Sequence, residues 1–174
     1  HATIRYFSNK LLDLGVDVRL NTKANLENLK EDGYSNIVLA SGVLPRSWKI
    51  PGSDRPEVVN YLEVLRGEVS VGEHVAIVGA GGIGFDVADF LTHDSDSEGF
   101  LKSWGIDESL SERGGLISSA RTKSKRSVYL LQRSQGKPGA KLGKTTGWIH
   151  RMTLRERGVN MWGGVKYTQI DDDG

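Results

Sequence analysis

The sequence predicts an α/β fold built on a Rossmann-like parallel sheet, with the sheet and its helices in three layers. His74–Val78 is a short apolar run, typical of a parallel strand that is covered on both faces. Glycine-rich residues 79–84 follow at once, and apolar residues from 83 to 91 then recur at helical spacing. A second buried run, Val128–Leu131, predicts the next strand. Strand, turn, helix and strand in this order favour a parallel sheet.

The composition is that of a globular chain. It has 174 residues, 23 Lys and Arg against 22 Asp and Glu, and a formal net charge of +1. Hydrophobic residues make up 37% and charged residues 26%, which argues against wholesale disorder. Because no apolar run approaches the roughly 18 residues of a membrane helix, we expect no membrane contact and a cytoplasmic location. The lack of cysteine excludes disulfides, a thiol nucleophile and cysteine-held iron–sulfur clusters within these residues.

The first 50 residues predict a helix followed by two strands. Apolar residues from Ile4 to Leu14 recur at helical spacing, and Gly15 stands where a C-terminal cap belongs. Residues 16–20 alternate as a strand, and Asn36–Ala40 predicts a more buried one. Because a chain that begins with a helix and continues with strands resembles one piece of a larger fold, we expect this chain to be part of a longer protein.

Three segments follow from this pattern: residues 1–50, a connector over residues 51–72, and a domain over residues 73–174. Prolines between Pro45 and Pro56 indicate the boundary, and residues 58–65 predict a short helix. Residues 93–125 predict an irregular excursion with one short helical piece. The remaining predictions are a helix from Thr145 or Thr146 to near Gly158, strands at Val159–Trp162 and at residues 165–169, and a turn at residues 171–174.

The junction between the strand at 74–78 and the next helix carries the pattern G-x-G-x-x-G. Gly79 permits a tight turn, Gly81 lets a pyrophosphate approach the backbone, and Gly84 lets the helix pack closely on the strand. The helix N-terminus offers free N–H groups and a positive dipole end to the phosphates. The predicted dinucleotide contacts are Gly79, Ala80, Gly81, Gly82, Ile83 and Gly84. The alternative is a glycine-rich turn without a ligand.

The end of the next strand favours NADPH over NADH. An NAD site usually has an acid there, which binds the ribose hydroxyls, whereas this chain has Gln132-Arg133-Ser134. Arg133 can hold a 2′-phosphate through two hydrogen bonds, and Ser134 can add a donor. Three lysines follow on a glycine-bearing loop: Lys137, Lys141 and Lys144. Because Arg133 lies much further from the glycines than the usual ~20 residues, a merely solvated Arg133 remains the alternative.

Charge is unevenly distributed along the chain. Residues 86–112 hold eight acidic residues and one Lys, whereas residues 121–157 hold eleven Lys and Arg and one acid. This basic segment favours a local anion site, and no nucleic acid partner is expected. A module that binds RNA or DNA stays an alternative, although stacking aromatics are not interleaved with the cations. The four histidines show no metal-ligand spacing, so no metal site is predicted.

Several stretches of the chain resemble the bacterial 2,4-dienoyl-CoA reductase family. They are VAIVGAGGIGFDVADFL at 75–91, VYLLQR at 128–133, GKTTGWIHR at 143–151, IVLASGVLPR at 37–46 and IDDDG at 170–174. The resemblance covers nearly the whole chain, and residues 143–151 are its most specific part. It implies a longer enzyme with a flavin barrel holding FMN and an iron–sulfur cluster, followed by FAD and NADPH domains. Electrons would pass from NADPH through FAD, the cluster and FMN to a dienoyl-CoA thioester.

By this resemblance, residues 1–50 are part of the FAD domain and residues 73–174 are the NADPH domain. The rest of the polypeptide is then the expected partner, and no catalytic residue is expected here. Ala40-Ser41-Gly42 resembles the A-T-G turn near FAD in two-dinucleotide flavoproteins, with Ser41 in place of Thr, and Ala24 would reach the adenine. The FAD glycine motif is lacking. A structural domain that has lost NADPH use, as in related flavin dehydrogenases, is the alternative.

Overall fold

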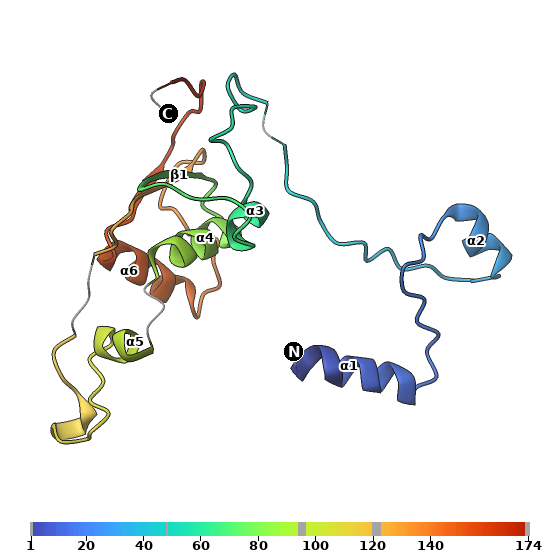
Figure 1. The fold of residues 1–174 in the computed structure, drawn as a ribbon, viewed down its shortest axis with the longest axis horizontal. Helices are drawn as coiled ribbons and strands as arrows, with labels where there is room; N and C mark the ends of the chain where they lie inside the picture. The colour runs from blue at the N-terminus through green and yellow to red at the C-terminus, as the bar shows by residue number, and fades with distance from the viewer. Residues whose placement is uncertain (1, 48, 94–96, 120–122, 173–174) are drawn as a thin grey trace. The chain divides into compact units, whose positions relative to one another are not determined.

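A computed structural model describes residues 2–47, 49–93, 97–119 and 123–172. The chain divides into two compact units, residues 1–43 and residues 44–174 (Figure 1). The sequence places its first boundary at residue 50 instead. Several predicted features reach beyond the described residues: parts of the excursion at residues 93–125, Arg121 at the start of the basic segment, and the end of the predicted turn at residues 173–174.

The first unit contains two helices, α1 (Ala2–Asp13) and α2 (Leu26–Glu31). Helix α1 is the predicted one. It ends as expected, because Gly15 has a φ of +66° and its N–H donates to the carbonyl of Leu12. Helix α2 is not predicted from the sequence. Its N-cap is Asn25, whose side chain accepts a hydrogen bond from the N–H of Asn28.

The two strands predicted in the first unit are wrong. Residues 16–20 and 36–40 form irregular, exposed chain, and Leu39 is 88% exposed. Apolar alternation alone does not make a strand, because a strand satisfies its N–H and C=O groups only through a neighbouring strand. Within the first unit, no described segment offers that neighbour.

The second unit is built on a sheet of three parallel strands in the order β1 (His74–Val78), β2 (Ser127–Gln132) and β3 (Asn160–Gly163). Ile77 is paired with Leu130, and Leu130 with Met161. This arrangement confirms the predicted α/β class and the three strands of this unit up to residue 163. The strand predicted at residues 165–169 is wrong, because the chain there is irregular.

Helices pack on one face of this sheet, so its described residues form two layers rather than the three that the sequence predicts. They are α3 (Tyr61–Leu65), α4 (Gly82–Thr92) and α6 (Gly147–Glu156), with α4 between the other two (Figure 1). Phe85 of α4, Leu130 of β2 and Leu154 of α6 are almost fully buried in one core. Burying a side chain of this size contributes about 1.5–3 kcal/mol. The core therefore holds α4 and α6 against β2.

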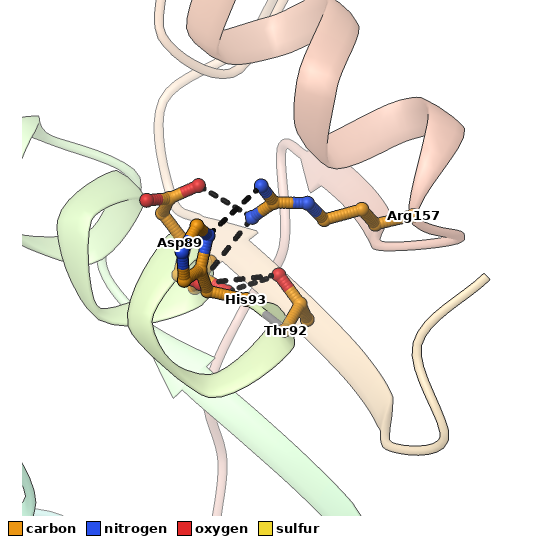
Figure 2. A network of polar contacts seen from close by, with 5 residues as sticks. Asp89, Thr92, His93 and Arg157 are labelled. Atoms are coloured by element: carbon orange, nitrogen blue, oxygen red, sulfur yellow. Dashed lines mark hydrogen bonds and ion pairs between the residues drawn. The ribbon is translucent and has the colours of Figure 1, made fainter. Parts of the chain in front are cut away.

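A polar network joins the C-terminal ends of α4 and α6 (Figure 2). The Nη1 of Arg157, just after α6, lies 2.6 Å from the Oδ1 of Asp89, and its Nη2 lies 3.3 Å from the Nδ1 of His93. The Arg157 side chain is 19% exposed and the Asp89 side chain 44%. The hydroxyl of Thr92 donates to the carbonyl of Ala88 at 2.7 Å. Arg157 thus links two helices that also share the apolar core.

The long excursion between α4 and β2 contains α5 (Ser97–Ser103) and a 3-10 helix at Arg113–Gly115. Beyond α5, Ile106 and Leu116 form an antiparallel bridge. The buried carboxylate of Asp107 accepts hydrogen bonds from Ser109, Ser111 and the N–H of Glu112. These bonds, above all that from the Ser109 side chain, lower the pKa of Asp107, although burial opposes the shift. One carboxylate therefore organises residues 107–112 of the excursion.

Replacing Arg157 tests the link between α4 and α6. We expect Arg157→Met to lower the free energy of unfolding by about 1 kcal/mol, because a half-exposed ion pair and its hydrogen bonds are lost. Urea denaturation measures this change. Arg155→Met removes the same charge from an exposed site two residues earlier and should change stability little. Equal effects of the two variants would contradict the role of Arg157.

Replacing Asp107 tests the excursion. We expect Asp107→Ala to raise the rate of tryptic cleavage after exposed Arg113 several-fold, because the carboxylate no longer holds residues 109–112. The control is Glu108→Ala, which should leave the rate unchanged.

The pH dependence supplies a second test. Because folding lowers the pKa of Asp107, its contribution to stability is complete above pH of about 4 and is lost as the pH falls through that lowered pKa. Amide hydrogen exchange at residues 109–112, compared with an unfolded reference, should therefore show less protection as the pH falls through this range.

Candidate functional site

The glycine turn leaves the carboxyl end of β1. Gly79 has a φ of +118°, a conformation that residues with a side chain rarely adopt. Its N–H donates to the carbonyl of Leu131 at 2.8 Å, so the pairing of β1 with β2 continues into the turn. The structure thus fits the tight turn that the sequence assigns to Gly79.

Gly84 lies in the first turn of α4, pressed against the same turn. A Cβ at Gly84 would stand 1.8 Å from the carbonyl oxygen of Gly79 and 3.3 Å from Leu130. Only a residue without a side chain lets α4 start this close to the strand. This close approach is the packing role that the sequence predicts for Gly84.

Gly81 and Gly82 face open space instead. A Cβ at either position would meet no atom of the described residues within 4 Å. Gly81 is the N-cap of α4, and no side chain caps this end of the helix. The first N–H groups of an uncapped, 11-residue helix attract anions. Of the other predicted contacts, Ile83 is 49% exposed, whereas Ala80 is buried in the core and can contribute only its backbone.

Arg133 and Ser134 follow the end of the neighbouring strand. Val78 is paired with Leu131, so the chain leaves β2 beside the glycine turn. Both residues are exposed, and within the described ranges the Arg133 side chain forms no hydrogen bond or ion pair. An exposed guanidinium beside an uncapped helix N-terminus is the arrangement expected for a phosphate-bearing ligand.

The predicted lysines lie on the loop after β2. Lys137, Lys141 and Lys144 are all exposed, and none of them forms an ion pair with another described residue. The loop itself is held by two residues that sequence reasoning missed, Gln132 and Arg151. The spacing of these two residues in the sequence shows no pattern. Their side chains donate hydrogen bonds to backbone carbonyls of the loop, which lie within reach only in the folded chain.

The residues assigned to FAD lie in the first unit. Ala24 and Ala40, Ser41 and Gly42 are exposed and belong to no helix or strand. Their contact with FAD stays a prediction. The described part of this unit contains no strand followed by a glycine turn and a helix, so it offers no second phosphate-binding turn.

One family model matches nearly the whole chain. The sequence model described as "Pyridine nucleotide-disulphide oxidoreductase" matches residues 4–174. Cinnamate reductase of Clostridium sporogenes is 39% identical over 90 residues, which are 52% of this chain and 13% of that protein. Metal reductase of Desulforamulus reducens is 28% identical over 177 residues, which are 97% of this chain and 26% of that protein. The chain thus spans about a quarter or less of these relatives.

A solved structure shares the fold. In the complex of 2-naphthoyl-CoA reductase with 2-naphthoyl-CoA, 21% of the reductase chain aligns with 99% of this chain, at a TM-score of 0.65 and 23% identity. At this identity the likeness shows the fold alone. In the described part of the chain, none of the helices has the length and apolar character needed to cross a membrane.

Gly84 offers a test of the turn. We expect Gly84→Ala to lower the free energy of unfolding by about 3 kcal/mol, because the new methyl group would overlap the Gly79 carbonyl and force α4 away from β1. Urea denaturation measures the loss. Gly82→Ala is the matched control: it adds the same methyl group in the same helical turn, but in open space, and should not destabilise the fold. Similar losses in both variants would contradict this packing.

Proposed function

Because the chain belongs to the pyridine nucleotide-disulphide oxidoreductase family, we propose that its second unit is the NADPH-binding part of a flavin-dependent reductase. The supporting observation is the open space at Gly81, which lies beside the strand end that carries Arg133. The family binds FAD and a nicotinamide dinucleotide, and the curated relatives are named as reductases.

The first step of the argument concerns the pyrophosphate. A domain that has lost its ligand is expected to fill the space beside Gly81 with side chains. In this chain a Cβ at Gly81 or Gly82 would still meet nothing within 4 Å. The uncapped N-terminus of α4 faces this space with its N–H groups. This geometry favours a working dinucleotide site over a purely structural domain.

The second step concerns the 2′-phosphate. The chain has no acid at the end of β2, where a carboxylate would bind ribose hydroxyls and repel a phosphate. Arg133 occupies that place, and within the described ranges no acidic side chain forms an ion pair with it. Ser134 adds a neutral hydroxyl donor, and the exposed Lys137 and Lys144 add positive charge on the same loop. This set of donors fits NADPH better than NADH.

Each segment of the protein has its own proposed role in binding NADPH, FAD or the remaining groups. NADPH supplies a hydride when it is bound, and the protein orients the nicotinamide and excludes competing reactions. The backbone at 79–84 and the cations at 133–144 bind the dinucleotide at its phosphates. Ala24, Ala40, Ser41 and Gly42 are the proposed FAD contacts. FMN, an iron–sulfur cluster and the substrate site are assigned to the rest of a longer polypeptide, which is the proposed partner.

For that longer protein we propose a cytoplasmic reductase of 2,4-dienoyl-CoA thioesters. The proposal rests on the resemblance at residues 75–91, 128–133 and 143–151. A relative named cinnamate reductase supports the wider class, because cinnamate, like a dienoyl thioester, carries a carbon–carbon double bond conjugated to an acyl carbon.

Replacing Arg133 tests the NADPH assignment. We expect Arg133→Ala to weaken NADPH binding by about 10- to 100-fold, because charge-assisted hydrogen bonds to the 2′-phosphate are lost. NADH binding should change by less than about twofold. Calorimetric titration of the full chain with each dinucleotide, at two salt concentrations, measures both. Arg155→Ala, which removes an exposed charge from α6, is the control.

Two outcomes would count against this assignment. Equal losses for NADPH and NADH would remove the 2′-phosphate role of Arg133. If wild-type chain bound NADH as tightly as NADPH, the assigned cofactor would be wrong. Gly81→Ala supplies the complementary variant: it should fold normally yet lose both dinucleotides, because its methyl group occupies the space assigned to the pyrophosphate.

A further inference from the structure

The loop after β2 is more firmly held than its exposure suggests. We define the cationic loop as residues 133–144; it carries Arg133 and three lysines, Lys137, Lys141 and Lys144. All four side chains are exposed. The backbone of the loop, in contrast, is tied at its start and at its middle by side chains that come from β2 and α6.

Gln132 holds the start of the loop. It is the last residue of β2, and its Nε2 lies 3.0 Å from the carbonyl oxygen of Ser134 and 3.3 Å from that of Gly136. The amide nitrogen of a glutamine has two N–H groups, so it can donate one to each carbonyl. The chain is thereby folded back over the strand end within four residues.

Strand β3 closes the other side of this turn. The N–H of Gly164 donates to the carbonyl of Ser134 at 3.0 Å. A Cβ at Gly163 would stand 2.1 Å from the carbonyl oxygen of Gly136, so the end of β3 packs directly on the turn. The position of Arg133, between Gln132 and Ser134, is therefore set by two strands.

Arg151 holds the middle of the loop. Its Nη1 donates to the carbonyl of Gly139 at 2.8 Å. Gly139 has a φ of +72°, and a Cβ there would stand 2.6 Å from the ring of Phe85. Phe85 belongs to α4, the helix that begins at the glycine turn. The loop that carries the cations is thus packed against the helix assigned to the pyrophosphate.

We propose that Gln132 and Arg151 are positioning residues that set the preference of this chain for a 2′-phosphorylated dinucleotide. They fix the backbone from which Arg133 and Lys137 project, so these cations meet the 2′-phosphate without first ordering a mobile loop. Such preorganisation raises affinity by lowering the entropy lost on binding. The inference rests on the proposed function and deepens it: Arg133 supplies the charge, and these two residues supply its placement.

Gln132→Met is the main test, because it removes both N–H donors without changing charge or length much. The probes are adenosine 2′,5′-bisphosphate and AMP, which share the 5′-monophosphate and differ only in the 2′-phosphate. We expect calorimetry on the full chain to show about a fivefold loss for the bisphosphate. AMP affinity should stay within about twofold. Gln135→Met alters an exposed glutamine of the same loop and should leave both affinities unchanged.

Arg151 supplies an independent variant at the second anchor. Arg151→Met removes the bond to Gly139 together with a charge, so Arg155→Met serves as the control for charge on the same helix. Arg151→Lys keeps the charge and a donor, and we expect it to recover most of the lost selectivity. Urea denaturation of each variant separates local loss of placement from loss of the fold.

The outcomes are distinct. A selective loss of the bisphosphate in Gln132→Met, and in Arg151→Met with rescue by lysine, supports the inference. If both variants keep the wild-type ratio of the two affinities, or lose both ligands equally, the inference is overturned. If wild-type chain itself shows no preference for the bisphosphate, the proposed NADPH function fails instead. Should Gln132→Met not fold, the Arg151 series decides alone.

Discussion

The parallel pairing of β1 with β2 is the constraint on which the candidate site depends. The pairing runs from His74 with Ser127 to Val78 with Leu131, and the N–H of Gly79 extends it by one more hydrogen bond. Because parallel strands end at the same edge of the sheet, this register brings two chemically different turns together. One turn offers open backbone at the start of a helix, and the other offers cations.

Helix α4 couples this edge to the rest of the second unit. It starts against the glycine turn through Gly84, buries Phe85 in the core, and ends in the ion pair of Asp89 with Arg157. Phe85 also forms the surface on which Gly139 packs. A change in the position of this helix would therefore reach the pyrophosphate turn and the cationic loop together.

The elements that sequence patterns predicted well are those with local causes. The apolar runs of β1 and β2 and the glycine turn between β1 and α4 are legible because strand burial and turn chemistry act within a few residues. The strands predicted at residues 16–20 and 36–40 failed for the opposite reason. The alternation at 16–20 and the apolar run at 36–40 state which side chains would be buried, but a strand forms only where another strand accepts its hydrogen bonds.

The sequence by itself determined the α/β class, the glycine turn and the sign of charge at the end of β2, since each depends on residue type and short-range order. Tertiary structure decided which backbone groups the side chains of Gln132 and Arg151 meet, and that Gly81 opens on empty space while Gly84 does not. The glycine motif assigns the two glycines different roles, but the sequence does not give the distances around each of them. They differ because the folded strand and helix converge on one of them and diverge at the other, and only the packed chain sets that distance.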